Sequence, residues 1–324
     1  MFYVFSIMLF IFIIFNSLGP AAKYHKEILV HIPKGSSTLE IAILLEKKQV
    51  IKSNIAFVAY YKIFGKDKKL KAGYYMLDSR SSTPQIIDKL NSGDISVINV
   101  TIPEGYNVKQ ISDVFSAKGI INKSKFLTLA KNGDFKYPFL PTKNNKNSYR
   151  LEGFLFPDTY QIKVGSTEKE IIEMMLDRFA EVFTKKDQEK AARMNLSSVK
   201  IITLASIIEK EAKLAVDRPV ISSVFHNRLN KGMRLESCAT IQYLLGKPKT
   251  KLSYDDLKIV SPYNTYLHKG LPPGPIASPG KAAIRAALYP ARTDYLYFLA
   301  KSNGAHVFSK TLEEHVLAKE KYIK

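Results

Sequence analysis

The chain contains little that would support cross-linking or metal binding. It has one cysteine, Cys238, in 324 residues, so no internal disulfide can form and stability must come from packing. We interpret Cys238, which precedes Ala239 and Thr240, as a small buried residue and not as a nucleophile. The histidines show no metal-ligand spacing, and the sequence contains no glycine-rich phosphate loop. We therefore expect neither a metal nor a cofactor.

Acidic residues are scarce relative to basic ones. The chain has 49 Lys and Arg against 29 Asp and Glu, which gives a formal net charge of +20. Such a balance favours polyanionic partners, among them nucleic acid, anionic lipid and acidic polymers. The sequence has no zinc, RNP-like or helix-turn-helix signature, which argues against nucleic acid. Its 46% hydrophobic and 24% charged residues are typical of a globular protein, and its length fits two domains.

No lysine or arginine precedes the apolar segment that opens the chain. Phe2–Phe15 is apolar apart from Ser6, and the apolar character continues through Leu18. Such a segment comes close to the ~30 Å hydrocarbon core of a bilayer, so we predict a single-span membrane anchor over residues 1–20. A secretory signal normally begins with basic residues, and their absence favours an uncleaved anchor. The small residues at 19–22 would nevertheless suit a cleavage site.

An internal repeat follows the apolar segment. Ile28–Gly35 matches Ile98–Gly105 without gaps, 70 residues further along the chain. Each copy predicts a strand, a Pro-Gly turn and two short helices, and a further strand and helix lie between the copies. We interpret residues 26–140 as a pair of small α+β modules suited to binding or spacing. The Asn-, Gly- and Pro-containing stretch at 131–150 predicts a domain boundary.

The C-terminal part, residues 150–324, predicts a second α+β domain. Apolar periodicity indicates helices at 168–183, 201–213, 218–230 and 281–288 and from residue 311 onward, with a strand at 295–300. Residues 261–280 contain five prolines and three glycines. So turn-rich a segment is either a structural wrap or the wall of a binding cleft.

Two carboxylates lie inside the apolar helix predicted at 201–213. Glu209 and Glu211 fall at opposite margins of its apolar stripe. Glu209 shares its side with small residues, which leave room for a ligand, whereas Glu211 shares its side with bulky ones. A carboxyl group held against apolar surface keeps its proton to higher pH, as a general acid requires. The alternative is that both are ordinary surface glutamates.

Five motifs in order carry a resemblance to a known family. They lie at 151–160 (LEGFLFPDTY), 204–212 (LASIIEKEA), 224–237, 261–280 (SPYNTYLHKGLPPGPIASPG) and 303–315. Together they resemble the YceG/MltG family of endolytic murein transglycosylases. The resemblance implies a single-pass protein of the cytoplasmic (inner) membrane. A LysM-like region would precede a catalytic domain on the periplasmic or extracytoplasmic side.

The resemblance also implies an activity and a catalytic residue. The family cleaves peptidoglycan glycan strands between N-acetylmuramic acid and N-acetylglucosamine and leaves 1,6-anhydromuramyl ends. Its catalytic glutamate falls on Glu209, which would donate a proton to the leaving oxygen and recover one from the muramyl C6 hydroxyl. By the same analogy the protein would act beside wall-synthesis enzymes and end the elongation of nascent strands. One departure, Glu236–Thr240, leaves the role of that acidic position open.

Four further residues are candidates for the glycan cleft, and each has a structural alternative. Glu152 could instead anchor a loop, Asn264 could be a turn residue and His306 a hairpin residue. Tyr263 could stack on a sugar ring, although aromatic side chains are more often part of the core.

Two other functions remain open at this point. A hydrolytic muramidase would need a second carboxylate, such as Glu152 or Glu211, on the far face of the sugar. A membrane-tethered protein could also hold glycan through its repeats without turnover.

Overall fold

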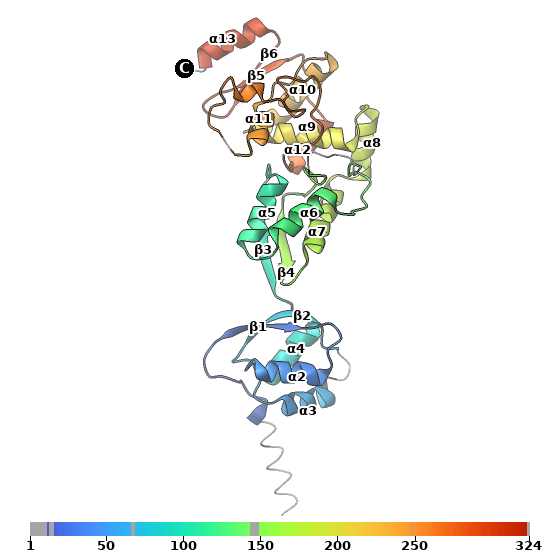
Figure 1. Cartoon of the computed structure of the whole chain (residues 1–324), viewed down its shortest axis with the longest axis vertical. Helices are drawn as coiled ribbons and strands as arrows, with labels where there is room; N and C mark the ends of the chain where they lie inside the picture. Colours follow the sequence, from blue (N-terminus) through green and yellow to red (C-terminus); the bar gives the residue numbers. More distant parts are fainter. Residues whose placement is uncertain (1–11, 13–15, 66–68, 143–148, 248, 323–324) are drawn as a thin grey trace, which may run out of the picture. The chain divides into compact units, whose positions relative to one another are not determined.

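The computed structural model describes residues 12, 16–65, 69–142, 149–247 and 249–322, and it divides into two compact units (Figure 1). The N-terminal unit contains residues 1–99 and 161–166, and the C-terminal unit contains residues 100–160 and 167–324. Most of the predicted anchor, residues 1–20, lies outside the described residues.

The N-terminal unit is a two-stranded sheet covered by helices. It contains β1 (Glu27–Ile32), α2 (Thr38–Lys47), α3 (Asn54–Phe64), β2 (Gly73–Asp78) and α4 (Thr83–Ser92). The strands pair antiparallel, with Glu27 opposite Asp78 and Ile32 opposite Gly73. Alternate residues of a strand face the same side, which places Val30 and Ile32 in the core with apolar residues of the helices.

The second copy of the repeat has the elements that the sequence predicts. It comprises β3 (Val97–Thr101), α5 (Val108–Ala117) and α6 (Lys123–Asn132), in the same order as β1, α2 and α3. Strand β3 pairs with β4 (Thr159–Lys163), a strand that the sequence analysis missed. Each helix begins at an asparagine whose side chain accepts a hydrogen bond from a backbone N–H of the first turn.

The division between the units differs from the predicted boundary at 131–150. It falls between Asn99 and Val100, so the helices of the second copy belong to the C-terminal unit. Helix α6 packs against α7 (Glu168–Val182), and the Leu151 N–H donates to the Ala130 carbonyl at 3.1 Å. Contacts of this kind are long-range, and a repeat in the sequence does not determine them.

The rest of the C-terminal unit is built around one buried helix, α9 (Ser198–Glu211). Every residue of α9 from Ile201 to Ile208 is buried. Helix α9 packs against four other helices of this unit (Figure 1), which are α8 (Lys185–Arg193), α10 (Arg218–Asn230), α11 (Cys238–Leu245) and α12 (Lys281–Leu288). The unit ends in the hairpin of β5 (Tyr297–Ala300) and β6 (His306–Ser309), followed by α13 (Leu312–Tyr322).

The helices predicted from apolar periodicity are present, whereas α8 and α11 were missed. Helix α8 is mostly charged and buries only Ala191, so its apolar signal is weak. Within the described part of the chain, no single helix is long and apolar enough to span a membrane. The pair of α8 and α9, bent by 93°, passes that test together on length and composition alone.

An aromatic cluster joins the motif at 151–160 to α7. Phe179 lies at its centre, with ring centroids 4.7 Å from Phe139 and 5.3 Å from Phe154. These side chains are fully or almost fully buried. Much of the LEGFLFPDTY motif therefore serves the core, because its apolar residues pack under the second repeat copy.

Truncating this cluster tests its contribution to stability. We expect Phe179→Ala to destabilise the C-terminal unit by about 3–5 kcal/mol, since it removes a fully buried ring and leaves a cavity. Urea denaturation of the full chain in detergent measures the loss. Tyr254→Ala, at a side chain that is 86% exposed, is the control and should change stability by less than about 0.5 kcal/mol. Equal effects of the two substitutions would contradict this account.

Candidate active site

Glu209 lies in the last turn of α9 and is held by two other elements. Its Oε1 accepts a hydrogen bond at 3.2 Å from Nη2 of Arg218, the first residue of α10. Its Oε2 accepts one at 3.0 Å from the backbone N–H of Gly280, the N-cap residue of α12. The side chain is 7% exposed. Glu209 is therefore fixed in orientation at the point where three helix ends meet.

A second carboxylate lies beside the same guanidinium. Oε2 of Glu104, in the turn that follows β3, is 4.0 Å from Nη2 of Arg218. Its side chain is half exposed, whereas that of Arg218 is 15% exposed. A Cβ atom added at Gly280 would lie 1.7 Å from Oε1 of Glu104. Only glycine therefore lets the Glu104 carboxylate approach the start of α12 this closely.

Backbone hydrogen bonds fix the turn that carries Glu104. The Gly105 N–H donates to the Ser278 carbonyl, and the Ser278 N–H donates to the Tyr106 carbonyl, each at 2.8 Å. From α9, Nζ of Lys210 donates to the Gly105 carbonyl at 3.3 Å. The turn of the second repeat copy is thereby joined to the Pro- and Gly-rich segment and to the helix that carries Glu209.

Around each of the two carboxylates, some groups favour the negative charge and others disfavour it. The pKa of Glu104 is raised by burial and by the negative charge of Glu209, while Arg218 lowers it. The C-terminal end of α9 disfavours a negative charge on Glu209, whereas Arg218 and the Gly280 N–H favour it. Nε of Arg218 is buried and has no hydrogen-bond partner among the described residues.

The small residues beside Glu209 serve packing. The prediction that they leave room for a ligand was wrong. They do not leave space for a ligand, because Ser206 is fully buried and its hydroxyl accepts the Ile276 N–H at 3.1 Å. Helix α12, which is rich in alanine, packs against α9. Small side chains thus allow the segment that ends at Gly280 to come close enough to bind the Glu209 carboxylate.

Glu211, the second glutamate of the helix, is committed to internal contacts. It accepts hydrogen bonds from the Ser237 hydroxyl and from the Ala239 N–H. Burial raises the pKa of its carboxyl group, and these hydrogen bonds oppose the shift. Such contacts join the end of α9 to the start of α11.

Glu152 lies at the wall of a groove. One carboxylate oxygen accepts the Val108 N–H at 3.0 Å, and the other accepts the Tyr243 hydroxyl at 3.2 Å. Burial raises the pKa of Glu152 to about 7. The adjoining cavity has a volume of about 620 Å³ and lies between α5, α6 and the end of α11.

A smaller pocket continues this cavity toward Glu209. Its volume is about 150 Å³, and it shares Asn107 and Tyr243 with the larger cavity. Gly105 and Lys210, the chain neighbours of Glu104 and Glu209, line its other end. We name the two together the α5–α11 groove, whose lining includes Gly105 and Lys210, the residues that follow Glu104 and Glu209 in the chain.

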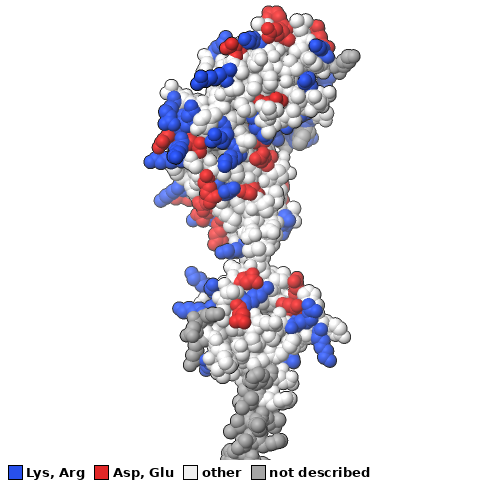
Figure 2. All heavy atoms as spheres, turned by 180° about the vertical axis from the view of Figure 1, so that it is seen from behind, with Lys and Arg blue, Asp and Glu red and all other residues white. Residues whose placement is uncertain are grey.

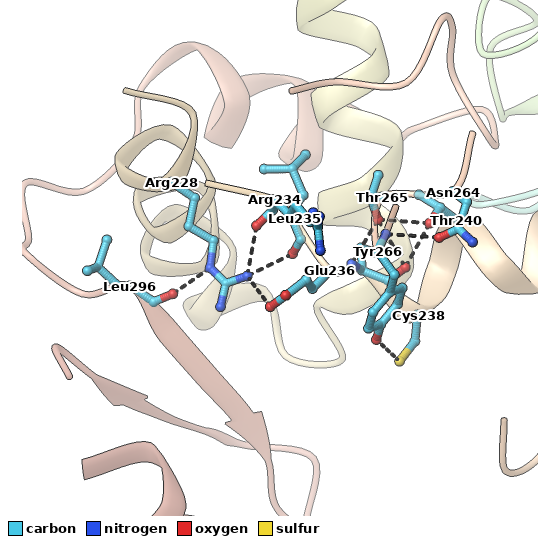
Figure 3. Close-up of polar contacts among 11 residues, drawn as sticks. Arg228, Arg234, Leu235, Glu236, Cys238, Thr240, Asn264, Thr265, Tyr266 and Leu296 are labelled. Atoms are coloured by element: carbon cyan, nitrogen blue, oxygen red, sulfur yellow. Dashed lines mark hydrogen bonds and ion pairs between the residues drawn. The ribbon is translucent and has the colours of Figure 1, made fainter. Parts of the chain in front are cut away.

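The other predicted cleft residues are buried and make internal contacts. Nδ2 of Asn264 donates to the carbonyls of Leu257 and Ile259. Its Oδ1 accepts the Tyr266 N–H (Figure 3). These are the contacts of a residue that closes a turn. Tyr263 is 4% exposed and its ring packs against that of Tyr243.

His306 lies in β6, as a hairpin residue. Its Nδ1 is 2.8 Å from Oδ2 of Asp217, which also accepts the His306 backbone N–H at 3.0 Å. The imidazole side chain is 1% exposed. This pairing fixes Asp217, the residue that directly precedes Arg218. His306 therefore contacts the site only indirectly, through Asp217.

The acidic position Glu236 and Cys238 lie near one another in Figure 3. Glu236 Oε2 accepts a hydrogen bond at 3.1 Å from the buried Arg228, which also donates to three backbone carbonyls. Cys238 is exposed, so its predicted burial was wrong, and its Sγ lies 3.0 Å from the Tyr266 hydroxyl. Cys238 is the first residue of α11, and the buried residues of that helix are the three that follow it, Ala239, Thr240 and Ile241.

Charged side chains were compared on one face of the molecule, and possible metal-binding groups among the described residues. On the face shown in Figure 2, basic side chains are interspersed with acidic ones. Among the described residues, no group of three or more His, Cys, Asp or Glu is arranged to hold a metal ion.

The structure brings Glu209 together with two residues that sequence reasoning missed, Glu104 and Arg218. One signal pointed to Glu104, because the first repeat copy has Lys34 at the matching position while most other residues of the turn are the same. A reversal of charge at one position of a repeat indicates a different role for that copy. Arg218, between Asp217 and Pro219, carries no comparable signal.

Fold and site together define a mixed α/β protein with a buried carboxylate–guanidinium pair beside a groove. The chain matches the YceG-like family over residues 30–321 and belongs to it. It is 41% identical over 317 residues to a Bacillus subtilis protein named endolytic murein transglycosylase, covering 94% of this chain and 88% of that one. A Streptococcus pneumoniae protein of the same name is 34% identical, and the match covers 93% of this chain and 60% of that protein.

A solved structure agrees with the fold. The crystal structure of a YceG-like protein from Listeria monocytogenes is 40% identical and matches with a TM-score of 0.64, covering 91% of this chain and all of the other.

Titration of Glu152 should make stability depend on pH. Its pKa is raised from 4.5 to about 7, so between these values the folded protein keeps a proton that the unfolded chain has released. Stability should therefore fall as pH rises from about 4.5 to 7, by roughly 3 kcal/mol. Thermal unfolding of the wild type and of Glu152→Gln at pH 5 and pH 8 measures this. The variant should lose less stability than the wild type, and parallel losses would contradict the assignment.

Proposed function

We propose that this protein is an endolytic murein transglycosylase that acts on peptidoglycan glycan strands. The observation that carries the proposal is Glu209, a carboxylate oriented by Arg218 and the Gly280 amide, whose chain neighbour Lys210 lines the α5–α11 groove. The Bacillus subtilis and Streptococcus pneumoniae relatives carry this activity in their names. The relation to them supports transfer of the activity, and the geometry supplies a group that can perform it.

In the reaction Glu209 acts twice on one bond. Its carboxyl proton passes to the glycosidic oxygen as the bond from that oxygen to muramyl C1 breaks, and the bond electrons stay with the leaving oxygen. The C6 hydroxyl oxygen of the same sugar then forms a bond to C1, and its proton passes to the Glu209 carboxylate. The enzyme regains its starting state, and the product carries a 1,6-anhydromuramyl end.

The contacts of Glu209 suit the interval between these two proton transfers. Glu209 is a carboxylate in that interval, and Arg218 and the Gly280 N–H each donate a hydrogen bond to one of its oxygens. Attack by a hydroxyl of the same sugar needs no activated water and avoids the entropic cost of a second molecule. A single carboxylate that touches the reacting atoms is therefore sufficient.

The two glutamates that the sequence offered as the second carboxylate for hydrolysis, Glu152 and Glu211, are held by internal contacts. Hydrolysis calls for a second carboxylate facing the sugar. Glu211 is held by Ser237 and Ala239, and Glu152 is held by Val108 and Tyr243. The sugar ends of the product separate the two reactions, because hydrolysis leaves reducing muramic acid.

The proposal includes a cellular setting that follows from the sequence. Residues 1–20 would anchor the protein in the cytoplasmic membrane, with both units on the extracytoplasmic side where the glycan lies. The repeat would serve as a LysM-like glycan-binding region. Beside wall-synthesis enzymes, the protein would cut nascent strands and so set their length.

Glu209→Gln tests the proposed function directly. Glutamine keeps the size of the side chain and one of the two acceptor oxygens, so it can accept from either Arg218 or the Gly280 N–H, and it cannot donate an acidic proton. We expect turnover to fall by at least about 10²–10⁴-fold. The measurement is digestion of purified sacculi by the full chain in detergent, followed by mass spectrometry of the released sugar ends.

Two controls make the result interpretable. Thermal unfolding of Glu209→Gln should occur at a lower temperature than that of the wild type, because Arg218 loses its charged partner, but a cooperative transition above the assay temperature shows that the variant is folded and separates loss of chemistry from loss of folding. Glu211→Gln, in the same helix turn, should keep measurable turnover. Normal release of anhydro-ended fragments by Glu209→Gln would refute the assignment of Glu209, and reducing muramic acid ends from the wild type would establish hydrolysis instead.

A further inference from the structure

Helix α3 carries apolar side chains on its outer side as well as on its packed side. Its buried residues are Ala56 and Phe57, and Phe57 belongs to the core of the N-terminal unit. Ile55 and Ile63 are nevertheless 71% and 69% exposed, and Phe64 at the end of the helix is 70% exposed. A helix that is apolar on all sides is normally enclosed by protein or by lipid. Within the described part of the chain, these three side chains have no such cover.

Ile55, Lys62 and Ile63 lie on one side of α3, which we name the α3 outer surface. At about 100° per residue, positions seven and eight apart return to nearly the same side of a helix. Lys62 is exposed, and α3 contains no aspartate or glutamate. Lys52, which directly precedes the N-cap residue Ser53, is exposed as well. Apolar side chains accompanied by lysines are typical of a helix that lies between lipid headgroups and acyl chains.

Another helix exposes apolar side chains without this charge pattern. Leu317 of α13 is 65% exposed, but the same helix carries Glu313, Glu314 and Glu320. Acidic side chains oppose contact with an anionic lipid surface. Exposure of apolar groups alone therefore does not distinguish α3, whereas exposure without acidic groups does.

The end of the predicted anchor lies beside the start of α3. The Leu18 carbonyl accepts the Thr83 N–H at 2.8 Å, and Leu18 is 9% exposed. Nζ of Lys52 lies 3.5 Å from the Asn16 carbonyl oxygen. Figure 1 shows α3 at the end of the N-terminal unit where this segment enters it. Because these contacts fix residues 16–18 to the unit, a bilayer that holds the anchor lies close to α3.

We propose that α3 lies on the surface of the bilayer, with Ile55 and Ile63 in the boundary between the headgroups and the acyl chains. The inference rests on the membrane anchor that the proposed function includes. A helix in this position buries its apolar side ~5–10 Å into that boundary. The bilayer then holds the N-terminal unit at two places, the anchor and α3, which restricts rotation of the unit about the anchor.

A second protein fits the α3 outer surface less well than lipid does. Helix α3 has 11 residues, so it is ~16 Å long and one side of it presents roughly 160–250 Å². A stable interface between proteins buries about 800 Å² on each partner. A bilayer needs no matching shape, so a small apolar surface beside an anchor is sufficient.

The absence of tryptophan from the chain gives the test a clean signal. Ile55→Trp and Ile63→Trp each place a single indole on the α3 outer surface. The full-length variants are reconstituted in vesicles of phosphatidylglycerol and phosphatidylethanolamine, with or without brominated acyl chains, which quench a nearby indole. We expect bromination to lower the fluorescence of both variants by more than about half, because the indole would lie at the depth of the first acyl carbons.

Two controls place the indole at exposed apolar residues elsewhere. Leu317→Trp makes a comparable change on α13, and Leu29→Trp makes one on β1 of the N-terminal unit. Figure 1 shows β1 at the other end of that unit from α3. Bromination should lower the fluorescence of these two variants by less than about 10%, since neither indole would reach the lipid.

The pattern across the four positions decides the outcome. Quenching at 55 and 63 without quenching at 29 and 317 supports the proposal. Equal quenching at all four positions, or none at 55 and 63, would overturn it. Blue-shifted emission at 55 and 63 without quenching would also overturn it, because a second copy of the chain would then cover α3. Thermal unfolding close to that of the wild type checks that each substitution leaves the fold intact, and two probe positions on α3 keep the test decisive if one of them fails this check.

Flotation of the full chain with the vesicles separates this inference from the proposed function. If the chain does not float, the proposed anchor and the role of α3 fall together. If it floats and α3 is not quenched, only the role of α3 falls. The Glu209→Gln assay is carried out in detergent, so the proposed activity depends on that result and not on the contact of α3 with lipid.

Discussion

The ion pair between Glu209 and Arg218 determines how the C-terminal unit is organised around its site. It joins the end of α9 to the start of α10, and the Gly280 N–H adds the start of α12. An unpaired carboxylate so little exposed would be strongly disfavoured, so these helix ends must stay together for the fold to be stable. The same contacts that stabilise this meeting point also fix the orientation of the Glu209 carboxylate.

Close packing around α9 makes this meeting point possible. Ser206 and the alanines of α12 keep the two helices near one another, and Gly280 admits the Glu104 carboxylate where any Cβ atom would exclude it. The small residues near Glu209 in the sequence are therefore explained by the approach of the backbone at 276–280.

The buried glutamates of this unit show that residue type and burial alone do not define a role. Glu152 and Glu211 are as buried as Glu209, yet each is bound by neutral donors that fix neighbouring helices. Only Glu209 combines a cationic partner, a second carboxylate and a bordering pocket. Its partners distinguish it: Arg218 lies nine residues further along the chain, and Gly280 lies 71 residues further along.

The sequence by itself determined the local elements and the family. Apolar periodicity predicted α3, α7, α9 and α10 because burial of one helix face leaves a repeating pattern, and the repeat predicted β3, α5 and α6. Motif order identified the family, and the role predicted for Glu209 stays a prediction. Tertiary structure alone decided that the second repeat copy joins the C-terminal unit, that Glu104 and Arg218 flank Glu209, and that Asn264 and His306 make internal contacts. The reason is physical: periodicity records which face of an element is buried, whereas charge pairing depends on which distant segments the folded backbone brings within a few ångströms.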